Sequence, residues 1–321
     1  MKHFILLLLF TFESIISFSQ QTKDFFNDDN EETDEVNAYY YKVGVKVRNS
    51  SGSTYYIDTV KTYYVKTNSL RSVSNYVEGF QEGEYKEYFE NGNLKETGVD
   101  EKSRDIGKWK SFYPDGKPQR IVEYPKKPGD ISKFSELDFK ILDYWDSTGA
   151  QTVINGNGHY KHYFFDKDVL RKEEGEVVNG LHDYAWKGYS NGILSYSENF
   201  SQGSFLDGIS YHEGNIFRYN VLSEPAEYPG GMKKLYKFLN SNIGYPIIAR
   251  KLGIVGRVFV QFVINTDGSL SDVKIIKGVH ESIDEESLRL VRSMPKWVPG
   301  KSRGREVKSK FVLPLTYNLQ R

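Results

Sequence analysis

Residues 227–246 read EYPGGMKKLYKFLNSNIGYP, and three more stretches follow them: GIVGRVFVQFVINTDGSL (253–270), SIDEESLRLVRSMPKWVPG (282–300) and KFVLPLTYNL (310–319). The first has the apolar spacing of an amphipathic helix. The second is rich in β-branched and aromatic residues around a turn, which is typical of two strands. The third opens with a helix-capping pattern, and the fourth alternates as strands do. The predicted order is therefore helix, strand, strand, helix, strand.

The first stretch predicts a helix that is apolar on one face. Its apolar residues recur at positions i, i+3, i+4 and i+7, which lie on one side of a helix. They are Met232, Leu235, Tyr236 and Leu239. Gly244 interrupts the pattern, and Pro246 disfavours helix at the residue before it. We expect a short second helix from Pro246 to Leu252.

Two strands and a longer helix are predicted next. Arg257–Ile264 favours a strand, and Asn265–Gly268 predicts the hairpin turn after it, because glycine accepts a positive φ. Val273 and Ile275 mark the return strand. Ser282 and Glu285 form an S-x-x-E capping box, which predicts the start of a helix. Pro295 is expected to end that helix.

The last strand contains a proline. Its alternating apolar residues, which predict a half-buried strand, are Phe311, Leu313, Leu315, Tyr317 and Leu319. Pro314 donates no hydrogen bond to a ladder, so it belongs on an edge strand or at a bulge. Either it protects the edge against aggregation, or the edge is left open for a partner strand. The residues alone leave both interpretations open.

These stretches together resemble the C-terminal domain of TonB proteins, the periplasmic domain that grips outer-membrane transporters. The resemblance is carried by Tyr245-Pro246, Ala249, Gly253, Gly256, Val258, Asp267-Gly268, the run from Met294 to Gly300, and Pro314. The preceding Tyr228–Gly231 segment resembles the Bacteroidetes-type variant. Each of these residues also has a purely structural interpretation: the glycines suit turns, Trp297 suits a core and Asp267 suits a turn.

The resemblance implies a partner-binding site. In TonB domains the terminal strand pairs with a short receptor peptide, the TonB box, and this favours the open-edge interpretation. The implied binding residues lie on the terminal strand and at the Tyr-Pro turn. They are Tyr245, Pro246, Lys310, Phe311, Val312, Leu313, Pro314, Leu315, Thr316 and Tyr317.

Residues 75–220 contain an irregular repeat whose core is an aromatic residue, two polar residues and a glycine. Its copies are Phe89–Gly92, Tyr113–Gly116, Tyr189–Gly192 and Tyr211–Gly214, with a longer version at Trp145–Gly149. Asn-Gly and Asp-Gly between aromatic strands predict hairpins, and stacked hairpins bury rings as solenoids do. The pattern resembles MORN-type repeats of exported bacterial proteins. The alternative is an unrelated antiparallel sheet with ordinary turns.

The predicted fold class is α+β. An N-terminal antiparallel β-meander of MORN-like hairpin repeats precedes a TonB-like C-terminal α/β domain. The predicted divisions are a signal peptide (1–19), an acidic disordered leader (20–38), the repeat domain (39–222) and the C-terminal domain (223–321).

The N-terminus predicts export to the periplasm. Lys2, the apolar run Phe4–Phe12 and small residues up to Ser19 are typical of a secretory signal peptide that is cleaved near Ser19 or Gln20. The chain has no cysteine, which excludes disulfides, thiol chemistry and a lipoprotein anchor at the cleavage site. Residues 21–38 carry seven acidic residues and one lysine, which predicts the disordered leader.

Charge and composition narrow the function classes. The formal net charge is zero, but residues 224–321 carry about twice as many Lys and Arg as Asp and Glu, which suits acidic peptides or anionic surfaces. No basic helix or aromatic stacking motif points to nucleic acid. No catalytic set is evident, and His159 and His162 lie on opposite faces of a strand. We therefore expect no enzyme, cofactor or metal site.

Two functions remain. The first is a periplasmic TonB-like protein that binds an outer-membrane receptor peptide by β-strand addition, in energy-dependent transport. The second is an exported structural or adaptor protein of the envelope, whose repeats bind a protein partner. The short linker Val221–Pro229 departs from the long Pro-rich spacer of energy-transducing TonB proteins, which argues against coupling to the inner-membrane motor. Expected partners are a TonB-dependent receptor or another envelope protein, a second copy through the C-terminal domain, and membranes only through partners.

Overall fold

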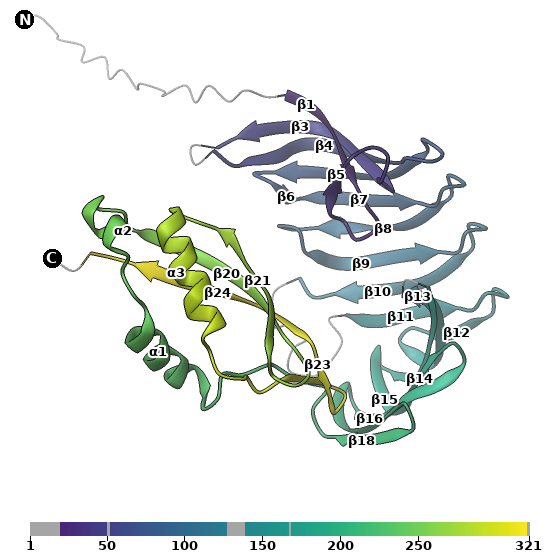
Figure 1. Cartoon of the computed structure of the whole chain (residues 1–321). Coiled ribbons are helices and arrows are strands. Elements are labelled where there is room, and N and C mark those ends of the chain that lie inside the picture. Colours follow the sequence, from purple (N-terminus) through teal and green to yellow (C-terminus); the bar gives the residue numbers. More distant parts are fainter. Residues whose placement is uncertain (1–19, 50–51, 127–138, 167, 320–321) are drawn as a thin grey trace, which may run out of the picture. The chain divides into compact units, whose positions relative to one another are not determined.

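The structure is a computed structural model that describes the chain except for residues 1–19, 50–51, 127–138, 167 and 320–321 (Figure 1). It divides into two compact units: residues 1–162 with 176–182, and residues 163–175 with 183–321. Antiparallel strands dominate the described residues, and three helices occur in the C-terminal part of the second unit.

This arrangement confirms the fold prediction in its coarse form, which is mainly antiparallel β-structure followed by a helix-containing C-terminal region. The predicted boundary between residues 222 and 223 lies inside the second unit and stays a prediction. The predicted signal peptide lies outside the described residues. Within the described part of the chain, no helix is long and apolar enough to span a bilayer.

In the first unit, most strands pair antiparallel with their neighbours along the chain (Figure 1). They are β1 (Gln20–Phe26), β2 (Glu32–Thr33), β3 (Tyr40–Arg48), β4 (Thr54–Tyr64), β5 (Leu70–Val77), β6 (Phe80–Gln81), β7 (Gly83–Tyr88), β8 (Leu94–Asp100), β9 (Asp105–Phe112), β10 (Pro118–Tyr124), β11 (Lys140–Trp145) and β12 (Gln151–Ile154). Strands β13 (Asn157–Asp166) and β14 (Val169–Val178) have residues in both units.

The repeat motif forms two kinds of hairpin turn. In Phe89–Gly92 and Tyr113–Gly116, the N–H of the aromatic residue donates to the carbonyl oxygen four residues later, at 2.9 and 2.8 Å. In Tyr189–Gly192 and Tyr211–Gly214, only the last two residues form the turn, and both have positive φ. That geometry is the type I′ turn, which matches the twist of a hairpin. One sequence motif therefore supports two loop lengths.

Glycines in the strands bring aromatic rings close to the backbone. Trp109 of β9 covers Gly98 of β8, and a Cβ on Gly98 would lie 2.1 Å from the indole ring. Three further glycines face rings in the same way: Gly175 with Trp186, Gly188 with Tyr196, and Gly208 with Tyr219. Only a residue without a side chain leaves room for these rings, so each pair fixes how adjacent strands pack.

Strand β1 lies in the acidic segment that we expected to be a disordered leader, and that prediction is wrong for residues 20–26. The strand pairs antiparallel with β3 along its whole length. Phe26 stacks on Tyr40 with ring centroids 5.2 Å apart, and Asp24 forms an ion pair with Lys46 at 2.8 Å. The two adjacent phenylalanines supply apolar surface that the acidic composition obscures.

More hairpins follow, in which β15 (Leu181–Ser190), which also has residues in both units, β16 (Ile193–Ser201), β17 (Ser204–His212) and β18 (Asn215–Tyr219) pair in order. The C-terminal part follows. Its elements are β19 (Ser223–Glu224), α1 (Gly231–Asn242), α2 (Ile247–Lys251), β20 (Gly256–Ile264), β21 (Leu270–Lys277), α3 (Glu281–Arg292), β22 (Gly300–Ser302), β23 (Arg305–Val307) and β24 (Ser309–Tyr317).

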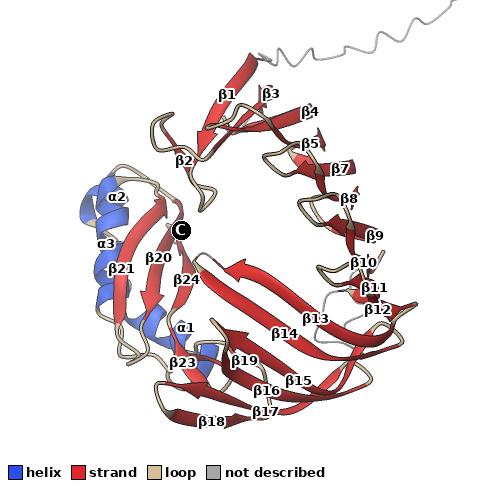
Figure 2. Ribbon diagram, turned by 90° about the vertical axis from the view of Figure 1, so that its right-hand side faces the viewer, coloured by secondary structure: helices blue, strands red, loops and turns tan. Residues whose placement is uncertain are grey.

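The core of the C-terminal part lies between a three-stranded sheet, ordered β21-β20-β24, and its helices. Figure 2 shows α2 and α3 on one side of this sheet. Alternate residues of β20 are fully buried there because a strand turns every second side chain to the same face. The buried cluster includes Leu235, Ala249, Val258, Val260, Phe262, Ile283, Leu290, Trp297, Leu313 and Leu315.

The C-terminal part contains more elements than the predicted order of helix, strand, strand, helix and strand. The short helix α2 was expected separately, but the hairpin β22–β23 was missed because it has only three residues in each strand. The prediction that Ser282 and Glu285 form a capping box is wrong. Helix α3 begins at Glu281, and its N-cap is His280, whose side chain accepts from the N–H of Ser282 at 3.3 Å. The imidazole therefore replaces the predicted serine as the cap.

Candidate functional site

Strand β24 lies at an edge of its sheet. It pairs antiparallel with β20 from Ser309 opposite Ile264 to Tyr317 opposite Gly256. Among the described residues no other strand pairs with it. One row of backbone N–H and C=O groups along β24 therefore lacks a strand partner, which is the arrangement that accepts an added strand.

The predicted alternation along β24 is present. Leu313, Leu315 and Tyr317 are buried at 2–3% exposure, whereas Val312 is 41% exposed. Lys310, Pro314 and Thr316 are exposed with it. Phe311 packs into the core, with its ring centroid 5.0 Å from that of Trp297. The binding residues predicted on this strand thus divide into a core-facing set and an outward-facing set.

Pro314 lies opposite Phe259 in an uninterrupted register, so there is no bulge at this point. A proline nitrogen donates no hydrogen bond, and a ladder tolerates it only where that nitrogen faces away from the partner strand. Backbone groups two residues apart in a strand point the same way. The N–H groups of Val312 and Thr316 therefore face the free edge together with Pro314.

The Tyr245-Pro246 turn is held in place by α3. The N–H of Gly244 donates to a carboxylate oxygen of Glu286 at 2.6 Å. Arg289 binds the same carboxylate with two nitrogens, both at 2.7 Å. The hydrogen bond from Arg289 lowers the pKa of Glu286, which keeps the carboxylate charged. The turn is thus fixed by charge-assisted hydrogen bonds, the stronger class of such bonds.

Tyr245 meets the end of β24. Its ring lies edge-on to that of Tyr317, with centroids 5.9 Å apart, and its hydroxyl donates to the carbonyl oxygen of Ile254. Burial raises the pKa of Tyr317, whose hydroxyl shares a 2.9 Å hydrogen bond with Ser287. Two parts of the predicted site, which are far apart in the sequence, are therefore adjacent in the fold.

A cavity of about 610 Å³ opens at this junction. It is lined by Ile243, Gly244, Tyr245, Arg250, Thr316, Tyr317, Asn318 and Leu319. Pro246 lines a second cavity of about 490 Å³, which shares Gly244 and Tyr245 with the first and also includes residues of α3. Lys310 lies at the opposite end of β24, so the structure does not bring it to either cavity.

Sequence reasoning missed two arginines beside the edge. Arg250 lines the larger cavity, and Arg257 donates from its Nε to the Oγ1 of Thr316 at 3.2 Å. Arg257 lies directly opposite Thr316 in the register, so the pairing of the two strands is the signal that could have found it. Both guanidiniums add positive charge at this end of the edge.

The predicted fold markers have structural roles. Trp297 is 3% exposed and packs edge-on against Tyr228 and Phe262, with centroids 5.5 Å from each. Asp267 binds Lys296 at 2.8 Å, and this hydrogen bond lowers the pKa of the Asp267 carboxyl. Within the described residues no group of three or more His, Asp or Glu side chains is placed to hold a metal ion.

The sequence matches two families. Residues 241–319 match the family described as Gram-negative bacterial TonB protein C-terminal, and residues 81–99 and 106–124 match the MORN repeat variant. This chain carries a TonB C-terminal domain with MORN repeats. The matched ranges contain the turn at Tyr245, the sheet edge β24, strands β7 and β10, and all but one residue each of β8 and β9.

Similar proteins include the protein TonB of two Helicobacter pylori strains, J99 and 26695. Each is 28% identical to this chain over 114 residues, which are 34% of this chain and 39% of the relative. The chain thus matches well under half of these relatives' length. Two solution structures of the Helicobacter pylori TonB C-terminal domain are also similar, with 27% and 28% identity and a TM-score of 0.23. They cover 28% of this chain and 81% and 95% of theirs.

Proposed function

We propose that this protein is a periplasmic TonB-like protein that binds an extended peptide of an outer-membrane receptor by strand addition to β24, in energy-dependent transport across the outer membrane. The observation that carries the proposal is the unpartnered edge of β24 in a TonB C-terminal domain. An added strand gains main-chain hydrogen bonds along the edge and side-chain specificity at alternate positions. The proposed binding residues remain Tyr245, Pro246 and residues 310–317.

The charge near this edge favours an acidic peptide. Arg250 and Arg257 lie at one end of β24 and Lys310 at the other, and all three are exposed. Complementary charge speeds association and selects partners, while the main-chain bonds hold the strand. A few such bonds at about 1 kcal/mol each, less the ordering of the peptide, supply only part of the binding free energy, so we expect an affinity no tighter than micromolar, about −8 kcal/mol.

Proline at positions 312 and 316 is expected to block the edge. Val312→Pro and Thr316→Pro each remove a donor that faces away from β20, so the ladder inside the domain stays intact. Each lost hydrogen bond is worth about 1 kcal/mol, or roughly fivefold in Kd. The double variant is expected to weaken binding by about thirtyfold or more. Titration calorimetry with N-terminal peptides of the host's outer-membrane receptors measures this change.

The matched controls change side chains but keep the donors. Val312→Thr and Thr316→Val are expected to bind within about twofold of the parent, because strand addition uses the main chain. Circular dichroism checks that the proline variants fold. If both folded proline variants bind peptide as tightly as the parent, β24 is not the docking edge.

The adaptor function is the second candidate. Strand β19 follows the last hairpin after three residues and pairs with β22, so the connection to the C-terminal domain is short and hydrogen-bonded. A protein that reaches across the periplasm from the inner membrane needs a long spacer, since an extended chain gains about 3.1 Å per residue. This connection favours an exported protein that acts without the inner-membrane motor.

The mature N-terminus distinguishes the two functions. We expect intact-mass spectrometry of protein from the native host to show a species that begins near Gln20, because of the predicted signal peptide. Such a cleaved protein supports the adaptor, and peptide capture by β24 then serves docking alone. A full-length species beginning at Met1 in the inner-membrane fraction supports energy transduction instead, and it would show that cleavage was wrongly predicted.

A further inference from the structure

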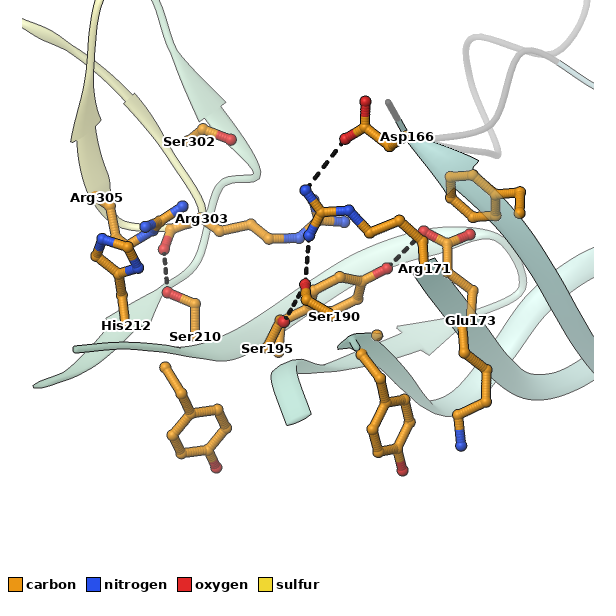
Figure 3. A pocket seen from close by; sticks show the side chains of 16 residues that line it. Asp166, Arg171, Glu173, Ser190, Ser195, Ser210, His212, Ser302, Arg303 and Arg305 are labelled. Carbon is orange, nitrogen blue, oxygen red and sulfur yellow. Dashed lines mark hydrogen bonds and ion pairs between the residues drawn. The ribbon is translucent and has the colours of Figure 1, made fainter. Parts of the chain in front are cut away.

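A cavity of about 440 Å³ lies in the second unit, where strands β14 to β17 meet the β22–β23 hairpin (Figure 3). It is separate from β24 and from the two cavities beside Tyr245. Charged side chains of both signs and several serines line it, so it is suited to a polar ligand. Most of its lining comes from β13–β17, which lie outside the TonB and MORN matches, and only its hairpin residues Ser302, Arg303 and Arg305 fall within the TonB match.

Two arginines extend into this cavity from opposite sides. Figure 3 shows Arg171 and Arg303 pointing toward one another. Each has its own carboxylate: Arg171 binds Asp166 at 3.1 Å, and Arg303 binds Glu198 at 2.6 Å. The charges of these two guanidiniums are therefore balanced within the protein. The cavity's third arginine, Arg305, lies beside them on the hairpin.

The positive charge of Arg305 is not balanced by an acidic side chain among the described residues. Its side chain is half-buried, and among the described residues it forms no ion pair or hydrogen bond. The remaining cation of the lining, Lys172, binds Glu174 at 2.9 Å. A half-buried guanidinium without a partner is a ready donor for a carboxylate, which its planar fork binds with two parallel hydrogen bonds.

Glu173 carries the negative charge that is not balanced among the described residues of this cavity. It faces the cavity from β14, and its polar partner among the described residues is the hydroxyl of Tyr196, which donates to it at 2.7 Å. Burial raises the pKa of Tyr196, so this hydroxyl stays protonated and continues to donate. No cation lies within ion-pair distance of Glu173 in the described part of the chain, so its carboxylate retains capacity for an ammonium group.

We propose that this cavity binds a short zwitterionic peptide, with its C-terminal carboxylate at Arg305 and its N-terminal ammonium at Glu173. In Figure 3 these two side chains approach from opposite sides of the cavity. A ligand with separated opposite charges matches the two unbalanced groups and leaves the whole site neutral. The serines at 190, 195 and 302 supply hydroxyls for the peptide backbone. The cavity volume suits two or three small residues.

Three matched probes test the proposal on the unmodified protein. Trialanine carries both charges, trialanine amide lacks the carboxylate, and N-acetyl-trialanine lacks the ammonium. Titration calorimetry is expected to show binding of trialanine, and about tenfold or greater weakening for each blocked form, because a charge-assisted hydrogen bond is lost. Absence of trialanine binding at millimolar concentration, or equal binding of all three, overturns the proposal.

Two variants assign the ends of the ligand. Arg305→Gln is expected to abolish the preference for trialanine over its amide, and Glu173→Gln the preference over the N-acetyl form. Arg218→Gln and Glu306→Gln are the controls, because both residues are exposed in the same unit and outside the cavity. The variant Val312→Pro/Thr316→Pro is expected to bind trialanine as the parent does. If Arg305→Gln keeps the preference for the free carboxylate, the assignment of Arg305 is wrong.

Discussion

Replacing Arg303 by methionine is expected to lower the free energy of unfolding of the second unit by about 3–5 kcal/mol. The substitution leaves the carboxylate of Glu198 without its counter-ion, and Glu198 is only 3% exposed. A buried charge that loses its counter-ion keeps its desolvation cost, and of the two groups that bind this carboxylate only the hydroxyl of Tyr219 remains. Thermal and urea denaturation of the full chain, followed by circular dichroism, measures the change.

The surroundings of Arg303 explain the size of this effect. Its guanidinium lies 3.8 Å from the ring centroid of Tyr196, and Tyr219 donates to Glu198 at 2.7 Å. Burial opposes the charge of Arg303 and is the largest single influence on its pKa, but the hydrogen bond to Glu198 and the nearby Tyr196, Glu198 and Tyr219 together outweigh it and raise the arginine's pKa. The carbonyl oxygen of Arg303 also accepts from Ser210 at 2.7 Å. The hairpin of the C-terminal part is therefore anchored on the last repeat strands.

Arg305→Met is the matched control for this experiment. Arg305 lies two residues away in the same hairpin and has no acidic partner among the described residues, so its loss is expected to cost less than about 1 kcal/mol. The double variant Arg303→Met/Glu198→Leu removes both charges and is expected to recover most of the stability. If Arg303→Met is as stable as Arg305→Met, the ion pair does not anchor the hairpin.

This anchor could not be predicted from the sequence. Arg303 and Glu198 are 105 residues apart, and neither stands in a motif that signals burial. The hairpin that carries Arg303 has strands of only three residues, which is too short for alternation to be visible. Its turn uses positive φ at Arg303 and Gly304, and an arginine gives no hint of that conformation.

Periodicity predicted the elements of the C-terminal domain well but their faces less well. Leu235 and Leu239 of α1 are buried as expected, whereas Met232 is 46% and Tyr236 is 57% exposed. The apolar spacing correctly gave a helix, but only two of its four residues face the sheet. The strict alternation of β24 was more informative, because a strand has only two faces and one of them covers the core.

The sequence predicted two separate parts of the candidate site but not how they come together. The edge strand and the Tyr245 turn were named from the family resemblance, and the contact of Tyr245 with Tyr317 joins them in space. Arg250 and Arg257 were missed because their proximity to Thr316 depends on the helix–sheet packing and on strand register. Binding by these residues stays a prediction that the proline variants test.

Replacing Trp109 by alanine is expected to destabilise the first unit by about 3–5 kcal/mol, the usual cost of removing a large buried ring. Trp109 is 4% exposed, and its ring packs against Tyr85 and Tyr124 with centroids 5.5 and 6.0 Å away. Phe80→Ala is the control in the same unit, because Phe80 is 51% exposed and its loss is expected to cost less than about 1 kcal/mol. Urea denaturation of the full chain measures both.

Substituting Gly98 tests whether the Trp109 ring packs directly on this glycine or is simply buried elsewhere in the unit. Gly98→Ala alone is expected to destabilise by about 1–3 kcal/mol, because its Cβ would lie 2.1 Å from the Trp109 ring. In the Trp109→Ala background that clash is gone, and alanine is favoured over glycine in a strand. Gly98→Ala is then expected to be neutral or stabilising, so the two changes are strongly non-additive. Simple additivity would show that the ring does not lie on Gly98, and the hairpins would then be held together by their turns and ladders alone.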